Sequence, residues 1–322
     1  MTNQPMASSP RKNVLMVNLF IGVAEVYTTG YRPGQRQLSG EQLHHLDAAC
    51  RREVTIELVW RICHRLKDAM YLPNSDLIMS QLKPSDVVLD IGGWAHPFNR
   101  ANYVMDSEPY ETRGYYNRTF AKNNPFPPLG GAVEHFTRDT WIRRDICDKT
   151  PYPFPDKSID LAICSHTLED VRDPLWVCSE MIRIASAGYI EVPSRLWESC
   201  RGHEPGIAGL SHHRWLIDIE DNGLRFLQKF HRIHNWEYSL PASVLRRLSQ
   251  RESVSWVFWQ GSLEFCEITL HGDAQTEELE RFVKSVRPYP MPLLRVKQAM
   301  RRVNEFSHRA TGKAHRTLAR SF

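Results

Sequence analysis

Residues 87–93 constrain the fold of this chain more than any other segment. The run Val87-Val-Leu-Asp-Ile91 is apolar except for Asp90, is rich in β-branched residues and is followed by Gly92 and Gly93. A short apolar run without polar alternation is typical of a strand that is buried on both faces of a parallel sheet. The two glycines predict a tight turn directly after that strand. Such a sheet needs helices on both faces, and 322 residues are enough to supply them.

Similar runs follow along the chain and alternate with helical spacing. We expect further strands over 102–106, 141–145, 159–164 and 188–192, and helices over 74–82, 173–185 and 276–286. Strands that alternate with helices predict an α/β fold with a doubly wound, mostly parallel, Rossmann-like sheet. In the last third we expect antiparallel strands over 224–233, and over 253–259 and 263–270, with a tight turn at 260–262 joining the last two.

The sequence predicts three regions. Residues 1–82 combine a polar, flexible leader with a helical N-terminal extension over about 40–70, residues 83–288 form the α/β domain, and residues 289–322 form a basic tail. The tail contains eight cations and one anion, whereas the whole chain has a net charge of only +4. Such a tail is either a solvated, partly helical segment or a contact for an anionic surface, such as nucleic acid or a membrane.

Cysteine usage favours a reducing compartment. The seven cysteines are an odd number and include no Cys-x-x-Cys pair, which predicts free thiols in a cytoplasmic protein. No apolar stretch approaches the roughly 18 residues of a transmembrane segment. Residues 11–24 have the outline of a signal peptide, but Asn18 at the centre of the apolar run favours a buried strand or helix. No feature of the sequence sets the oligomeric state.

Aspartates end three of the predicted strands. Asp90, Asp106 and Asp145 are expected at one edge of the sheet, where ligands of doubly wound folds bind. Asp106 follows Asp90 at close to the spacing of about 20 residues at which a carboxylate reaches a ribose hydroxyl. The turn after Gly92 and Gly93 lacks the G-x-G-x-x-G pattern that binds a pyrophosphate. The sequence therefore favours an adenosyl ligand without phosphate.

Several segments resemble one known family. These segments are Val88-Leu-Asp-Ile-Gly-Gly-Trp94, residues 151–174 with Pro-Phe-Pro-Asp-Lys-Ser, residues 188–194, residues 211–215 and residues 226–229. They look like class I S-adenosylmethionine-dependent methyltransferases of the type 11 group, over about residues 85–235. The resemblance implies a methyltransferase fold, S-adenosyl-L-methionine as the cofactor, and methyl transfer as the activity.

The resemblance also implies roles for particular residues. Asp90 and Gly92, with Gly93 beside them, would line the methionine and ribose part of the cofactor, and Asp106 would bind the ribose hydroxyls. Asp145 and Ile146 would frame the adenine. Ser165 and His166 would lie beside the sulfonium and the methyl acceptor.

Three histidines are candidates for catalysis. His166, His212 or His213 would accept the proton that an oxygen or nitrogen acceptor releases on methylation, unless these side chains only form the pocket wall. Glu191, Glu198, His203 and Glu204 share the run, and all of these residue types bind metals. However, no histidine pair has the i,i+4 spacing of a zinc helix, and neighbouring side chains of an extended chain point to opposite sides. No metal site is therefore predicted.

The sequence does not identify the methyl acceptor, although a small molecule, lipid or glycan is favoured over a long polymer. A second hypothesis is a catalytically inactive methyltransferase-like binding protein. Trp94 or His96 stands where the family usually has a glycine, and Asp170 stands where it commonly has histidine. A third hypothesis is a methyltransferase whose basic tail binds nucleic acid.

Overall fold

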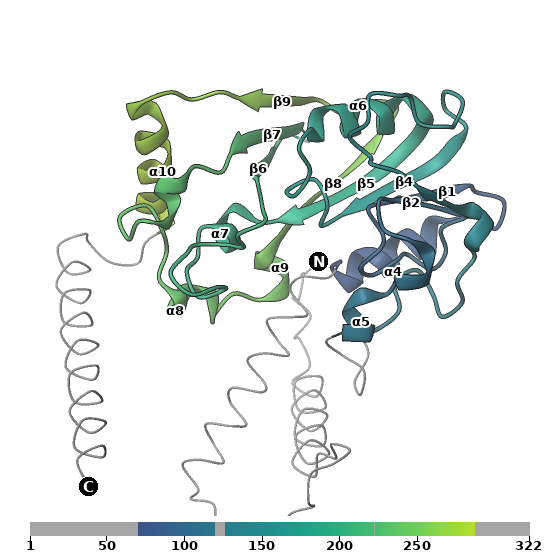
Figure 1. Cartoon of the computed structure of the whole chain (residues 1–322), viewed down its shortest axis with the longest axis horizontal. Helices are drawn as coiled ribbons and strands as arrows, with labels where there is room; N and C mark the ends of the chain where they lie inside the picture. Colours follow the sequence, from purple (N-terminus) through teal and green to yellow (C-terminus); the bar gives the residue numbers. More distant parts are fainter. Residues whose placement is uncertain (1–69, 120–125, 222, 287–322) are drawn as a thin grey trace, which may run out of the picture. The chain divides into compact units, whose positions relative to one another are not determined.

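The computed structural model describes residues 70–119, 126–221 and 223–286, and the compact unit that contains them begins at Met70. The predicted leader, the segment 11–24, the helices expected over 40–70 and the basic tail lie outside the described residues. Within this unit, a sheet of six strands has the order β3-β2-β1-β4-β5-β8, and three further strands form a second sheet (Figure 1).

The central sheet confirms the predicted fold class. Strands β1 (Val88–Ile91), β2 (Tyr103–Asp106), β3 (Trp141–Arg143), β4 (Ile159–Ser165) and β5 (Ala185–Pro193) run parallel. Strand β8 (Val254–Gln260) is antiparallel to β5 and ends the sheet. The chain builds outward from β1 to β3 and then returns to β4, so the strand order reverses between β1 and β4. This doubly wound topology places a ligand crevice at the carboxyl ends of these two strands.

Burial on both faces explains why the strands have continuous apolar runs. Leu89 and Ile91 of β1 belong to the core cluster of helix α6 (Pro174–Ile184), whereas Val88 belongs to the cluster of helix α4 (Leu72–Gln81). The side chains of a strand alternate between its two faces, so α6 and α4 cover opposite faces of the sheet. All four residues of β1 are buried, as expected of a central parallel strand.

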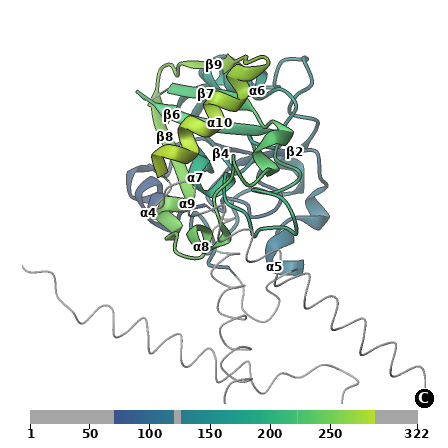
Figure 2. The same cartoon turned by 90° about the vertical axis from the view of Figure 1, so that its left-hand side faces the viewer.

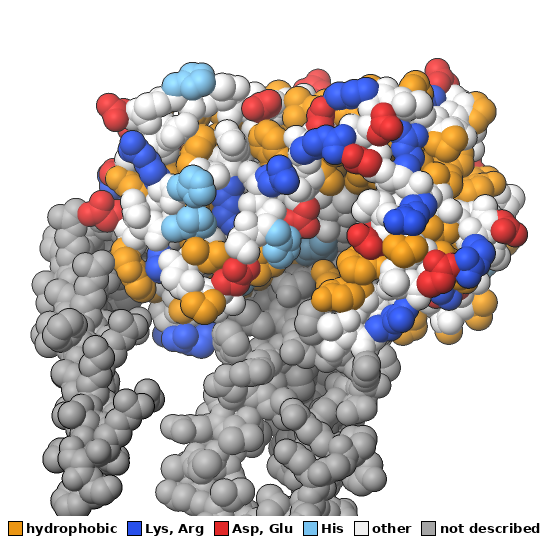
Figure 3. Space-filling view, viewed as in Figure 1, with side chains coloured by type: hydrophobic (Ala, Val, Ile, Leu, Met, Phe, Trp, Pro, Cys, Tyr) orange, Lys and Arg blue, Asp and Glu red, His pale blue; other side chains and the backbone are white. Residues whose placement is uncertain are grey.

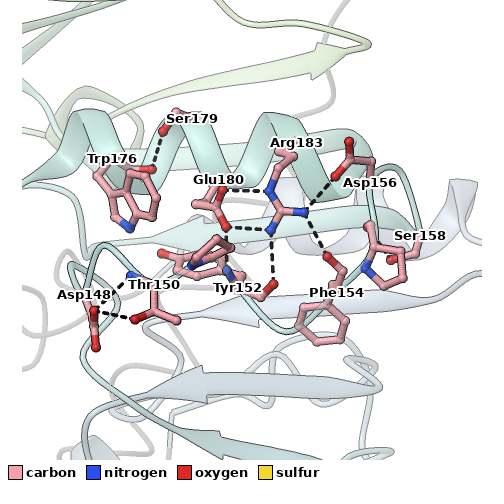
Figure 4. A network of polar contacts seen from close by, with 12 residues as sticks. Asp148, Thr150, Tyr152, Phe154, Asp156, Ser158, Trp176, Ser179, Glu180 and Arg183 are labelled. Atoms are coloured by element: carbon pink, nitrogen blue, oxygen red, sulfur yellow. Dashed lines mark hydrogen bonds and ion pairs between the residues drawn. The ribbon is translucent and has the colours of Figure 1, made fainter.

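Helix α6 begins and is anchored where the sequence predicts it. Asp173 caps its first turn by accepting a hydrogen bond from the Trp176 amide at 2.9 Å, and Pro174 occupies the first helical position. Near its end, the Arg183 guanidinium donates to the carbonyls of Tyr152 (3.1 Å) and Phe154 (3.0 Å) (Figure 4). The same group forms ion pairs with the carboxylates of Asp156 and Glu180. Arg183 thus fixes the Pro-Phe-Pro-Asp loop to the helix.

Replacing Arg183 with alanine should lower the free energy of unfolding by roughly 3 kcal/mol, because several charge-assisted hydrogen bonds are lost together. The carboxylate of Glu180, which is largely buried, would also lose its cation. Urea unfolding measures the loss. Arg225, whose ion pair with Glu220 is half exposed on both sides, is the matched control, and its alanine variant should change stability by less than about 1 kcal/mol. Equal effects of the two variants would contradict this role of Arg183.

The second sheet differs from the predicted arrangement. It has the order β6-β7-β9, formed by Trp215–Glu220, Gly223–Gln228 and Phe265–Ile268. Strands β6 and β7 are antiparallel, but β9 pairs with β7 in parallel, and β8 pairs with β5. The predicted hairpin over 253–270 is therefore wrong, because β8 completes the central sheet, where Val257 and Trp259 join the core. The strand predicted over 224–233 ends at Gln228.

Short elements connect these layers. They are η2 (Tyr110–Thr112), α5 (Tyr115–Thr119), η3 (Arg138–Thr140), α7 (Arg195–Glu198), η4 (His231–His234), α8 (Ala242–Leu245) and α9 (Gln250–Ser253). Helix α10 (Asp273–Val286) follows β9, and Leu279 of this helix packs with Leu216 and Leu227 of the second sheet (Figure 2). Among the described residues, no helix combines the length and apolar character needed to cross a membrane.

Candidate functional site

The carboxyl ends of the central strands bring most of the predicted site residues to one edge. Asp90 of β1 pairs in register with Ile163 of β4, and Ser165 at the end of β4 pairs with Glu191 of β5. Asp106 ends the neighbouring strand β2. These residues therefore line the position where the strand order reverses, as the sequence predicts for a ligand site.

The turn after β1 requires both glycines. Gly92 has φ +78°, and a Cβ atom there would lie 2.2 Å from the Thr167 hydroxyl oxygen. A Cβ atom on Gly93 would lie 2.1 Å from a carboxylate oxygen of Asp90. The Gly92 amide also donates to the carbonyl of Met105 in β2 at 2.8 Å. Only glycine fits such a close approach of backbone and side chains, so the turn after β1 is tightly specified.

Asp90 is buried and already holds this turn. Its Oδ2 atom accepts a hydrogen bond from the Phe98 amide at 2.8 Å, and the residue is only 3% exposed. Burial raises the pKa of Asp90 to about 7, which the Phe98 hydrogen bond opposes and the charge of Asp106 supports. Burial therefore shifts this carboxyl group toward its protonated form.

Asp106 holds the same turn from the neighbouring strand. Its carboxylate accepts hydrogen bonds from the amides of Trp94 (3.1 Å) and Glu108 (2.9 Å). Burial raises the pKa of Asp106, although these amides oppose the shift. Each carboxylate oxygen has more than one lone pair, so the group retains acceptor capacity for a ligand hydroxyl.

The bulky residues of the turn are packed against the segment after β2. The Trp94 ring stacks on Tyr115 at 4.7 Å between ring centres, and its indole donates to the Thr112 hydroxyl at 2.9 Å. His96 lies 5.9 Å from the ring of Phe126, and burial lowers the pKa of His96 to about 4. The described parts of the predicted loop over 107–137 thus cover the turn.

Asp145 and Ile146 follow β3, which ends at Arg143 and not at Asp145 as predicted, and the Arg144 amide donates to the carbonyl of Asp106 at 2.8 Å. Asp145 is half exposed and forms an ion pair with Arg172. Desolvation opposes the shift, but the Arg172 guanidinium and the Cys147 amide together lower the pKa of Asp145. The Ile146 side chain is buried in the core cluster of α6, and its carbonyl accepts a hydrogen bond from the Tyr152 hydroxyl at 2.8 Å.

His166 follows β4 directly in a left-handed backbone conformation with φ +51°. Its Nε2 atom lies 3.1 Å from the carboxylate of Glu191, which is fully buried. Its Nδ1 atom lies 3.8 Å from the carboxylate of Glu169. The Ser165 hydroxyl beside it is buried and has no hydrogen-bond partner among the described residues. The two carboxylates hold the imidazole ring in a fixed orientation at the end of β4, beside the Ser165 hydroxyl.

His213 belongs to a buried ionic group. Its Nδ1 atom lies 2.8 Å from the Glu198 carboxylate, which also forms an ion pair with Lys229. The Glu198 and Lys229 side chains are 2% and 4% exposed. Burial opposes protonation, but Glu198 raises the pKa of His213 to about 9. Burial likewise opposes ionisation of Glu198, yet the two cations lower its pKa to about 2.

His212 and His213 do not point to opposite sides of the chain. A turn at 211–212 brings both Nε2 atoms to the same carboxylate oxygen of Asp170, at 4.0 Å and 3.7 Å. The prediction that these neighbouring histidines diverge is therefore wrong, because it assumed extended backbone. Figure 3 shows histidine side chains among acidic and basic ones on one face of the molecule.

Glu169, Glu198 and Lys229 were not predicted as site residues. Glu169 is buried next to His166, and burial raises the pKa of Glu169 to about 7, against the influence of His213 and His166. The Leu-Glu-Asp sequence after Ser-His is a visible signal for Glu169. Nothing local identifies Lys229, because its partner Glu198 lies 31 positions earlier in the chain.

The strand order and the antiparallel β8 define the class of fold, a Rossmann-like domain like that of the class I methyltransferases. Among solved structures, a methyltransferase of Mesorhizobium loti is 19% identical, with 51% of this chain and 66% of that chain covered and a TM-score of 0.27. A methyltransferase of Aquifex aeolicus is 18% identical, with 41% and 68% covered and a TM-score of 0.26. Both depend on S-adenosylmethionine by their descriptions.

The chain spans about half to two thirds of the length of such structures, from 52% to 68% for the first four. No protein-family model matches the chain, and no curated protein matches it. The strand order and the antiparallel β8 are therefore the observations that carry the fold assignment.

Proposed function

We propose that this protein is an S-adenosylmethionine-dependent methyltransferase. One observation carries the proposal: a glycine turn, the buried Asp90 and the half-buried Asp106 lie at the switch point of a doubly wound sheet. That position binds nucleoside ligands, and the turn provides no G-x-G-x-x-G nest for a pyrophosphate. Asp106 would bind the ribose, the turn with Asp90 would face the methionine part, and Asp145 with Ile146 would frame the adenine.

The cofactor supplies an electrophilic methyl group, so this chain has to position the acceptor and take up its proton. His166 is the candidate base, because it follows β4 directly and the carboxylates of Glu191 and Glu169 orient its two ring nitrogens. Ser165 is available to orient a polar acceptor, since its hydroxyl has no described partner. His212 is exposed and would act only on an acceptor that reaches the outer rim.

The proposed acceptor is a small molecule, a lipid or a glycan. The described residues between Ser107 and Thr137 cover the turn after β1, which suits a confined acceptor better than a long polymer. The basic tail, which lies outside the described residues, would contact an anionic surface. We also propose a cytoplasmic location, which the free thiols of the five described cysteines support.

Calorimetric titration with S-adenosylmethionine and S-adenosylhomocysteine tests the proposal. Both should bind, and Asp106→Ala should weaken binding about 10- to 100-fold, because two hydrogen bonds to a charged group are lost. Asp139→Ala is the matched control, since this exposed aspartate lies on η3 ahead of β3, and it should bind normally. Circular dichroism checks that both variants fold. Absence of binding to the folded wild-type protein would overturn the proposal.

A second candidate is a binding protein with this fold and no turnover. The packing of Trp94 on Tyr115 and of His96 near Phe126 favours it, because these bulky side chains fill the region where the family usually has glycine. Transfer of labelled methyl groups across a panel of acceptors separates the two functions. Cofactor binding without transfer to any acceptor would favour the binding protein.

A further inference from the structure

Three side chains from two separate segments bring metal-binding atoms together. Asp170 follows β4, and His212 and His213 precede β6. One Asp170 oxygen and the two Nε2 atoms all lie within 4.8 Å of one another. The two imidazole rings meet edge to face, with 4.7 Å between their centres. Two imidazoles and one carboxylate on a common point are a recurrent metal-binding set.

Buried oxygens in this cluster lack partners. The Asp170 oxygen that faces both histidines is shielded from solvent and has no hydrogen-bond partner among the described residues. Oε2 of the adjacent Glu169, whose side chain is 3% exposed, also has none in the described part of the chain. Buried polar atoms are normally paired, so the unpaired Asp170 oxygen that faces the two histidines points to a missing cation.

The backbone holds the two segments in this arrangement. The amides of Arg214 and Trp215 both donate to the carbonyl of Glu169, at 2.7 Å and 3.2 Å. The Trp215 indole donates to the carbonyl of Val171 at 2.9 Å. These bonds bracket Asp170 on both sides and fix the residue after His213. The ligand set is therefore held by the fold and not by the flexible side chains alone.

Glu198 orients one of the rings for coordination. It lies 2.8 Å from Nδ1 of His213, which leaves Nε2 directed at Asp170. A carboxylate on the second nitrogen of a histidine is the usual support of a metal ligand, because it fixes the ring and raises its basicity. Lys229 forms an ion pair with Glu198, so the Asp170 carboxylate is left to face the metal ion.

We propose that Asp170, His212 and His213 bind a divalent transition-metal ion, with zinc as the best match for two nitrogens and one oxygen. Ligand atoms about 2.0–2.1 Å from a tetrahedral zinc ion lie about 3.3 Å apart. The two Nε2 atoms, 4.0 Å and 3.7 Å from the Asp170 oxygen, must therefore approach it by less than about 1 Å, and they must approach each other by about 1.5 Å at most. His212 is 60% exposed and free to make that movement. The exposed side leaves a fourth position for water or a substrate oxygen. The inference does not rest on the proposed methyl transfer.

Zinc titration of the full-length, chelator-treated protein without any adenosyl ligand tests the site. Wild type should bind, and His212→Ala should bind zinc at least about 10-fold more weakly, because one of three ligands is lost. His271→Ala removes another exposed histidine as the matched control and should bind like wild type. Asp170→Ala should repeat the loss. Unfolding curves of each variant establish that the fold is intact.

Cobalt absorption spectra distinguish this site from thiolate sites elsewhere in the chain. A nitrogen and oxygen set gives ligand-field bands without intense thiolate charge-transfer bands, and the ligand-field bands should disappear in His212→Ala. Excess magnesium should not displace the cobalt, because magnesium prefers oxygen ligands. Equal zinc affinity of wild type and His212→Ala, or cobalt bound with thiolate bands only, would overturn the proposal.

Discussion

Replacing Glu198 with glutamine should reduce the free energy of unfolding by about 3 to 5 kcal/mol, the usual cost of breaking a buried ion pair from one side. Glu198 lies between Lys229 and His213, whose side chains are 4% and 5% exposed. Glutamine keeps the shape of the side chain but removes its charge. The Lys229 ammonium would then remain buried with no described carboxylate to neutralise it. Urea unfolding at neutral pH measures the loss.

A surface variant provides the comparison for Glu198. Glu220 and Arg225 form an ion pair at 3.0 Å in which both side chains are 51% exposed. Glu220→Gln removes the same charge by the same chemical change, and it should alter the free energy of unfolding by less than about 1 kcal/mol. If Glu198→Gln changed stability no more than Glu220→Gln, the buried ionic group would not stabilise the fold.

The Asp90→Asn variant should gain stability relative to wild type as the pH rises from about 4 to about 7. Folding raises the pKa of Asp90 from 3.8 to about 7, so the folded protein holds a proton that the unfolded chain has lost. Wild-type stability therefore decreases across this interval, and a full shift corresponds to on the order of 4 kcal/mol. Asparagine retains an oxygen for the Phe98 amide but does not titrate.

Urea unfolding of both proteins at pH 5 and pH 8 tests this expectation through the change in their stability difference. That difference removes the contributions of all other titrating groups that the two proteins share. Asp139→Asn, at an aspartate that is exposed in the folded protein, is the control and should show a difference that is independent of pH. A pH-independent difference for Asp90→Asn as well would mean that burial does not shift this carboxyl group.

The local sequence pattern was sufficient to predict the parallel strands, but it did not predict which strands pair when they lie far apart in the chain. Strand β1 could be predicted because its burial on both faces selects apolar residues. The turn at Gly92 could be predicted because its close approach to Thr167 requires glycine. The antiparallel β6 was missed, although Asn222-Gly223 is a strong hairpin signal. The partner of β9 could not be found, because nothing in its own residues favours β7 over β8.

In the candidate site, too, local features could be predicted from the sequence and contacts between distant segments could not. The strand-end aspartates could be located because parallel strands end at one edge of a sheet. The cluster of Asp170, His212 and His213 could not, since it depends on a turn at 211–212 and on hydrogen bonds between segments about 45 positions apart. Sequence reasoning about alternating side chains applies only while the backbone stays extended.

The position of β8 in the central sheet has a consequence for how the chain folds. Val254 of β8 pairs with Pro193 of β5, and the entire β6–β7 hairpin lies between them in the sequence. The five parallel strands are synthesised long before the strand that covers their open edge at β5. Late pairing of distant segments slows folding, and an uncovered edge invites association with other chains. We therefore expect nascent chains that end before β8 to depend on chaperones. Full-length chains, in which β8 covers the edge of β5, should no longer need them.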